Sequence, residues 1–193
     1  MIFIPNRTAL TPSDSVQWDQ GDKHGSGSVL NDSNNQYLLA DGSSLTVKHV
    51  RFFSTKPNGT NRILRIDNVL SDWVDGNFTP NDKLLYSDTQ SAQDGPIIIE
   101  FNTPISAAGV NIQTSTYGEF TGVILAIDTN GLGYKFKRLG TSGTGNGTAI
   151  FLGISSHMSN IIRLEFSTTN IVENGHADFD KGGFAINHLS IAT

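Results

Sequence analysis

The sequence contains no cysteine, only four glutamates and no long apolar run. Without cysteine the chain has no disulfide framework and no thiol nucleophile, and zinc could be held only by histidines and carboxylates. The longest apolar stretches fall far short of the roughly 18 residues that a membrane span needs, so none is expected. The net charge of -5, from 13 lysines and arginines against 18 acids, argues against a nucleic-acid partner because phosphate backbones are bound by clustered cations.

Aspartate makes up 14 of the 18 acidic residues. Because aspartate favours turns and caps whereas glutamate favours helices, this excess predicts strands joined by loops. No window of about 11 residues shows the apolar spacing of an amphipathic helix. At 193 residues a single core is the natural expectation, so we predict one all-β domain over residues 1–193.

Short apolar or alternating segments bounded by turn residues predict about eleven strands. They are expected at 37–40, 44–54, 62–67, 83–87, 96–102, 108–114, 119–128, 133–139, 148–154, 160–167 and 184–191. Within one of them Tyr134 and Phe136 alternate with lysines, which predicts a core face and a solvent face. The Asp128-Thr-Asn130-Gly131 run predicts a hairpin turn. We therefore predict a two-sheet antiparallel β-sandwich with jelly-roll connections.

The last predicted strand changes its apolar face partway along. Phe184 and Ile186 share one parity, whereas Leu189 and Ile191 share the other. A β-bulge at Asn187-His188 would produce this switch, and bulges redirect side chains and backbone oxygens beside functional sites.

The strand succession of the second half resembles bacterial exported proteins of the PEP-CTERM-sorted type. Their extracellular part is similar to a galactose-binding-like jelly roll. The segments that carry the resemblance are Ile98-Ile-Glu-Phe101, 104–113, 118–128, 148–154, 161–166 and 183–191, with a weaker match at Asp14-Ser-Val-Gln-Trp18. The resemblance implies an extracellular or cell-envelope protein.

Two features depart from that family. A signal peptide and the family's Pro-Glu-Pro sorting tail do not occur in these 193 residues, so we expect a trimmed chain or a relative that is not membrane-sorted. The family's last strand usually reads Phe-Ala-Ile-Asp, and many jelly-roll sugar-binding modules use this Asp as a calcium ligand. Here Asn187 keeps the oxygen but loses the charge.

A structural calcium ion is the one cofactor that these residues suggest. Asp178 and Asp180 precede two glycines, a spacing that can bring two carboxylates round a hard cation. Turn-forming hydrogen bonds from the same carboxylates explain the spacing equally well. Asn187 is a third candidate ligand. Asp19, with Asp14 and Asp22, is an alternative donor, because in jelly rolls of this type the chain start often lies beside the final strand.

Sugar binding has a more plausible set of candidate residues than catalysis has, but the set specifies no particular sugar. Aromatic rings stack on pyranose faces while Asp and Asn bind the hydroxyls, and Asp72, Trp73, Asp75 and Asn77 combine these types in one loop-like stretch. Trp18 beside Asp19 is a second candidate. The alternative is that both tryptophans fill the core beneath long loops. Gly-x-Ser-x-Gly and Walker motifs are absent from the sequence, and no pair of carboxylates is singled out for glycoside hydrolysis.

The sequence therefore predicts a non-catalytic carbohydrate- or matrix-binding module, with a polysaccharide or glycan as its partner. Two alternatives remain open at this point. One is a structural or adhesive module that binds protein, and the other is a polysaccharide lyase or glycoside hydrolase built on the same fold.

Overall fold

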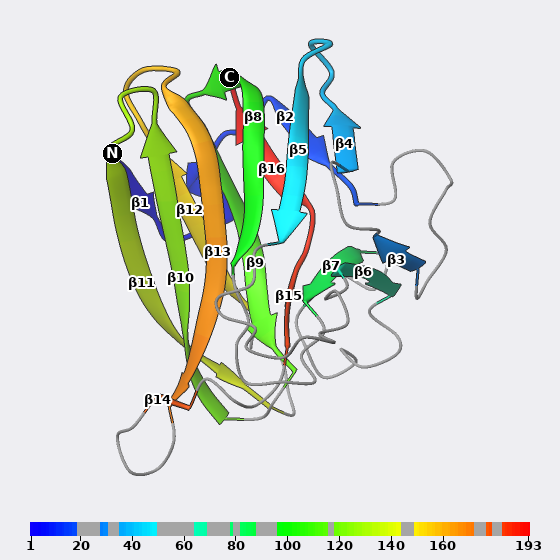
Figure 1. The fold of residues 1–193 in the computed structure, drawn as a ribbon. Helices are drawn as coiled ribbons and strands as arrows, with labels where there is room; N and C mark the ends of the chain where they lie inside the picture. Colours follow the sequence, from blue (N-terminus) through cyan, green and yellow to red (C-terminus); the bar gives the residue numbers. More distant parts are fainter. Residues whose placement is uncertain are drawn as a thin grey trace, which may run out of the picture.

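The chain forms an antiparallel β-sandwich, seen in a computed structural model (Figure 1). The structure describes residues 1–18, 28–30, 35–49, 64–68, 78, 82–87, 96–115, 118–143, 149–171, 177–178 and 183–193. In these ranges the secondary structure consists of strands and one short 3-10 helix, η1 (Arg7–Ala9). The predicted all-β sandwich is confirmed. Among the described residues, no helix has the length and apolar character that crossing a membrane would require.

The first sheet, called sheet A, has nine strands. Their order is β1 (Ile2–Ile4), β12 (Ile150–Ser155), β9 (Ala107–Thr114), β15 (Phe184–Ile186), β7 (Lys83–Ser87), β6 (Leu64–Asn68) and β3 (Ser28–Leu30). The last strand, β16 (Leu189–Ala192), follows β15 along the same side of β9 and pairs on its other side with β2 (Asp14–Val16).

The second sheet, called sheet B, has seven strands. Their order is β11 (Gly133–Ser142), β10 (Gly118–Asp128), β13 (Ile161–Ile171), β8 (Ile97–Ile105), β5 (Ser44–His49) and β4 (Asn35–Leu38), and β14 (Ala177–Asp178) pairs with β13. The two sheets contain more strands than the sequence predicted. The additional ones, β1, β2, β3 and β14, are two or three residues long, and the last predicted strand is divided into β15 and β16.

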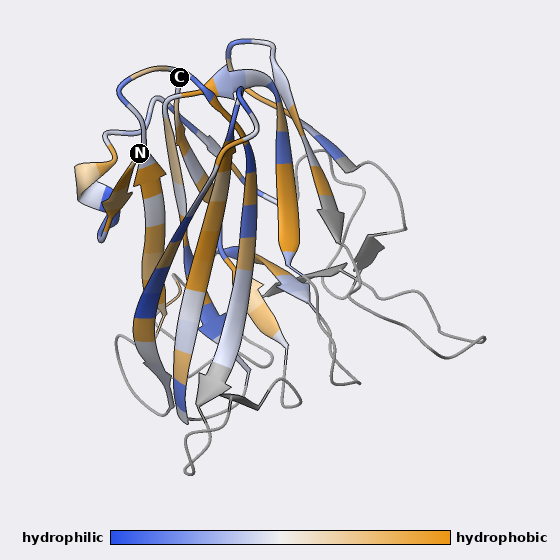
Figure 2. Ribbon diagram, turned by 60° about the vertical axis from the view of Figure 1, so that its left-hand side comes forward, coloured by the Kyte–Doolittle hydropathy of each residue, from blue (hydrophilic) through white to orange (hydrophobic). Residues whose placement is uncertain are grey.

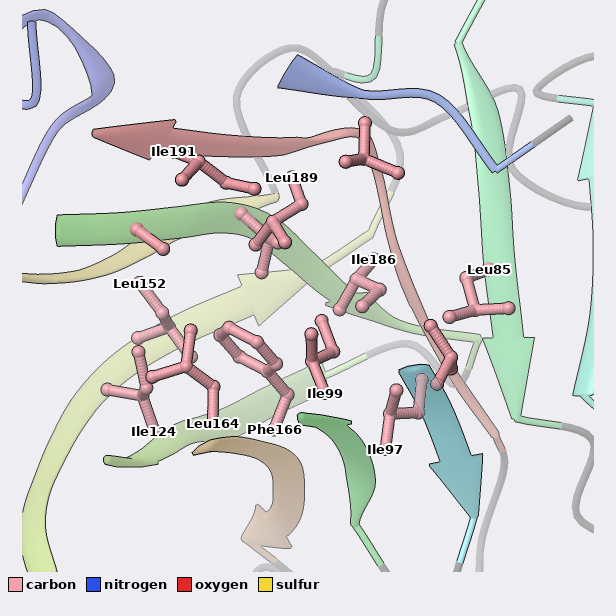
Figure 3. Close-up of a cluster of buried hydrophobic side chains, with 14 of the residues drawn as sticks. Leu85, Ile97, Ile99, Ile124, Leu152, Leu164, Phe166, Ile186, Leu189 and Ile191 are labelled. Atoms are coloured by element: carbon pink, nitrogen blue, oxygen red, sulfur yellow. The ribbon is translucent and has the colours of Figure 1, made fainter. Parts of the chain in front are cut away.

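The hydrophobic core lies between the two sheets (Figure 3). Its labelled side chains come from both of them: Leu85, Leu152, Ile186, Leu189 and Ile191 from sheet A, and Ile97, Ile99, Ile124, Leu164 and Phe166 from sheet B. All ten are fully buried. Hydrophobic and hydrophilic bands alternate along several strands in Figure 2, as expected of strands with one face in a core.

The β10–β11 hairpin confirms the turn predicted from the sequence. Asp128 organises it: the Asp128 carbonyl accepts from the Gly131 N–H at 2.9 Å, and its Oδ1 accepts from the backbone N–H of Asn130 at 2.8 Å and of Leu132 at 2.9 Å. Within this turn only Gly131 has the left-handed backbone, with φ +79°. The turn therefore requires its glycine, whereas Asn130 keeps an ordinary backbone conformation.

Gly131→Ala is expected to lower the free energy of unfolding by about 1 kcal/mol, because a Cβ disfavours the left-handed conformation. Urea denaturation measures the change. Gly143→Ala is the matched control, since Gly143 has an ordinary φ and no atom within 4 Å of the added Cβ. Equal losses in the two variants would contradict the special role of Gly131.

Candidate functional site

The last strand is interrupted at the position where its apolar face switches. Ile186 of β15 pairs with Ile112, and Ser190 of β16 pairs with Gly109, so the three residues 187–189 lie opposite two residues of β9. One extra residue in one strand defines a β-bulge, which confirms the break predicted at Asn187-His188. The bulge lets Phe184, Ile186, Leu189 and Ile191 all reach the core.

The Asn187 side chain repairs the ladder that the bulge disrupts. The Asn187 N–H donates to the Asn111 carbonyl at 3.1 Å, while the Asn111 N–H donates to Oδ1 of Asn187 at 2.8 Å. The side-chain oxygen thus replaces a backbone carbonyl. The Asn187 backbone carbonyl is free to accept from the Trp18 indole Nε1–H at 2.8 Å, which ties the bulge to the core.

Arg7 binds the same bulge from the outer face of sheet A. Its Nη2 donates to Oδ1 of Asn111 and of Asn187, each at 3.0 Å, and its Nη1 donates to Oγ of Ser190. The guanidinium also lies over the Phe151 ring, 5.3 Å from its centroid, which is cation–π geometry. Burial lowers the pKa of Arg7, and the nearby negative charge of Asp82 opposes this shift. The cation is therefore held mainly by neutral oxygen atoms and an aromatic face.

Asp82 and His188 complete the polar cluster, which we define as Arg7, Asp82, Asn111, Asn187, His188 and Ser190. Nδ2 of Asn187 donates to Oδ2 of Asp82 at 3.0 Å. Nδ1 of His188 lies 3.4 Å from the other carboxylate oxygen. Asp82 is buried and His188 is half-buried.

The N-terminal residues cover the outer face of sheet A beside the polar cluster. Ile4 and Leu10 pack there with Ala107 and Phe151 in a small apolar cluster. Asn6 caps η1 by accepting from the Ala9 N–H at 3.0 Å. The Arg7 contacts therefore fasten a covering segment to the last strand, more than 180 residues away in the sequence.

The residues predicted for ligand or metal binding are distributed as follows. Asp72, Trp73, Asp75 and Asn77 lie outside the described residues, as do Asp19 and Asp180. Asp178 lies in β14, where its backbone position is paired with Asn170 of β13. Within the described ranges, no group of three or more histidines and acids could hold a metal ion.

Trp18 lies in the core and is fully buried. Its ring meets that of Tyr37 edge to face, with the centroids 5.5 Å apart, and the Tyr37 hydroxyl donates to the Trp18 carbonyl at 3.1 Å. A ring in this position presents no face on which a sugar could stack. This is the arrangement that the core-filling alternative describes: Trp18 is a core residue.

Four members of the polar cluster were missed in the sequence: Arg7, Asp82, Asn111 and Ser190. Asn111 and Ser190 are polar residues that alternate with apolar neighbours in their strands. In the sequence this pattern looks the same as that of any solvent-exposed strand residue. Arg7 and Asp82 precede or follow strands and belong to no motif. The one detectable signal was the parity switch at Asn187.

The structure defines the class of this protein as an antiparallel β-sandwich whose last strand is fastened to the N-terminal segment by a partly buried polar cluster. No family model and no curated protein matches the chain.

Proposed function

We propose that this chain is a non-catalytic carbohydrate-binding module of the extracellular space or cell envelope. The observation that carries the proposal is the burial of Phe78 and Asp82, which follow Asp72, Trp73, Asp75 and Asn77 in the sequence. The segment that holds these four residues follows β6 and leads to two anchored residues, Phe78 and Asp82.

Both anchors are buried against sheet A. Phe78 is 5% exposed and packs with Leu84, Ala149 and Ala185. Asp82 is 7% exposed and accepts from Nδ2 of Asn187. The two residues that follow Asn77 in the described structure are thus held on a rigid scaffold, and binding residues are often found in segments joined to such a scaffold.

The chemistry of the segment suits a sugar. The Trp73 indole offers an apolar face for a pyranose ring, and the carboxylates of Asp72 and Asp75 with the Asn77 amide accept and donate hydrogen bonds to hydroxyl groups. Two of the carboxylates in the described ranges make ion pairs within the fold. Glu165 and Glu100 of sheet B lie 2.6 Å and 3.7 Å from the Arg163 guanidinium.

A calcium ion belongs to the same proposal, but Asn187 does not fit the role of its ligand. Oδ1 of Asn187 accepts from both the Asn111 N–H and the Arg7 guanidinium, and a fixed cation 3.0 Å away opposes a second one. The calcium proposal therefore depends on Asp178, Asp180 and Asp19.

Affinity gel electrophoresis through neutral and acidic polysaccharides tests the function. We expect retardation by at least one of them, weakened about tenfold or more in Trp73→Ala because a stacked apolar face is lost. Trp73→Phe should keep part of the retardation, and repeating the gel with a chelator shows whether calcium contributes. Absence of retardation in every gel, by both wild type and Trp73→Ala, would contradict the proposal.

A further inference from the structure

Strand β11 forms one end of sheet B and is ten residues long. In the part of the chain that the structure describes, it pairs with β10 alone, and Figure 1 shows it at the left-hand side of the sandwich. A strand at the end of a sheet leaves half of its backbone N–H and C=O groups without a ladder partner, so it can accept another strand.

The register identifies which backbone groups face outward. Asp128 N–H donates to the carbonyl of Leu132 at 3.0 Å, and the β10–β11 register continues without a shift from Ile127↔Gly133 to Gly118↔Ser142. Bonded pairs in an antiparallel ladder recur at every second residue. The N–H and C=O groups of Lys135, Lys137 and Leu139 therefore face away from β10.

The charge of β11 is opposite to that of the whole chain. The strand carries Lys135, Lys137 and Arg138 and no acid, whereas the chain has a net charge of -5. Lys135 and Lys137 are exposed, and their cross-strand neighbours are Leu125 and Val123. Neither lysine makes an ion pair with a described residue. Arg163 on the same sheet shows the contrast, because it is paired with Glu100 and Glu165.

The other face of β11 offers apolar surface. Tyr134 and Phe136 pack against the core but are only partly buried, and the Phe136 ring stacks on Phe3 of β1 with the centroids 5.7 Å apart. Beyond them the Arg138 guanidinium donates to the carbonyls of Pro5 and Phe151, which links the two sheets. The partly exposed apolar surface of β11 therefore lies along residues 133–137.

We propose that β11 binds an extended segment of a protein partner as an added strand, and that this segment alternates acidic and apolar residues. Its backbone would pair with the outward groups of Lys135, Lys137 and Leu139. Its acids would face the two lysines, and its apolar side chains would face Tyr134 and Phe136.

The charged and apolar residues that alternate along β11 favour this partner over a second copy of β11 and over a polyanionic glycan. A second copy of β11 would place cations near cations across the new ladder, which is destabilising. A polyanionic glycan would be attracted by the lysines but would use neither the outward backbone groups nor the rings of Tyr134 and Phe136. The same lysines also discourage uncharged strands from adding to the edge.

Binding of synthetic ten-residue peptides to the intact chain tests the proposal. The probe alternates glutamate and valine, and the composition control groups its glutamates in one half and its valines in the other. We expect the alternating peptide to bind at least about tenfold more tightly than the grouped peptide. Only the alternating peptide has glutamates spaced to face both lysines when it lies along β11 as a strand. On binding, the amides of Lys135, Lys137 and Leu139 should become protected from hydrogen exchange.

The double variant Lys135→Glu/Lys137→Glu should lose the acidic peptide and gain an alternating lysine–valine peptide. Lys135→Arg/Lys137→Arg is the matched control and should bind the acidic peptide like wild type. Both lysines are exposed, so the melting temperatures should stay close to that of wild type. Polysaccharide retardation should be unchanged in both variants, which separates this proposal from the proposed function.

Three results would overturn the inference. Equal binding of the alternating and grouped peptides would show a general charge attraction without strand pairing. Binding without new protection of the three amides would place the peptide elsewhere. Stronger binding of a sulfated polysaccharide than of the peptide, lost in the glutamate variant, would assign the lysines to a glycan.

Discussion

Replacing Trp18 with alanine is expected to lower the free energy of unfolding by about 3–5 kcal/mol, the usual cost of truncating a large buried aromatic side chain. Trp18 is the largest of the fully buried side chains. The truncation removes its edge-to-face contact with Tyr37 and leaves a cavity beside it. It also removes the N–H that the Asn187 carbonyl accepts, so a buried oxygen loses a partner.

Trp18→Phe separates these contributions. Phenylalanine keeps most of the apolar volume but has no N–H, so we expect a loss of about 1–3 kcal/mol from the unpaired Asn187 carbonyl together with the smaller ring. Urea denaturation of the two variants and wild type provides the comparison. A loss below about 1 kcal/mol in Trp18→Ala would contradict the placement of this ring in the core.

Asn187→Ala is expected to lower the free energy of unfolding by about 2–4 kcal/mol, because several buried or partly buried polar groups lose a partner in one substitution. The Asn111 N–H loses the acceptor that continues the ladder, and the Arg7 guanidinium loses one of the oxygen atoms to which it donates. Asp82 loses the amide donor on its Oδ2. Urea denaturation measures the effect, and stability equal to that of wild type would show that the polar cluster does not hold the bulge.

A second variant, Asn187→Asp, tests the contact between Asn187 and Asp82. The carboxylate keeps an oxygen for the Asn111 N–H and for Arg7, but it replaces the donor to Asp82 with a second negative charge at hydrogen-bond distance. One of two adjacent carboxylates then has a raised pKa in the folded state. Stability relative to wild type should therefore be lowest near neutral pH and recover as the pH falls and that carboxylate is protonated. A difference from wild type that does not change between pH 7 and pH 5 would contradict this arrangement.

The fold was predictable from the sequence where side chains alternate over long strands. The β10–β11 hairpin is one example, because Tyr134 and Phe136 alternate with lysines and the turn carries its glycine. The bulge was predictable for the same reason, since an inserted residue reverses the parity of everything after it. The short strands β1 and β2 were not, because three residues establish no period.

The polar cluster was beyond sequence reasoning for a different reason. Its hydrogen bonds join residues 76 to 183 positions apart, such as Asn111 with Asn187 and Arg7 with Ser190. Hydrophobic periodicity reports which face of a strand is buried but carries no information on which distant side chain faces it. The predicted sugar-binding segment remains a prediction, because Asp72, Trp73, Asp75 and Asn77 lie outside the described residues.

The position of β16 has a consequence for how this protein folds during synthesis. The strand consists of residues 189–192 and lies between β2, formed by residues 14–16, and β9. β2 therefore cannot join sheet A until residues 189–192 have been synthesised, and until then the edge of β9 that pairs with β16 is unpaired. Such long-range pairing makes folding slow and exposes intermediates to aggregation. We expect nascent chains in which β16 has not yet paired to be more prone to aggregation than the complete fold.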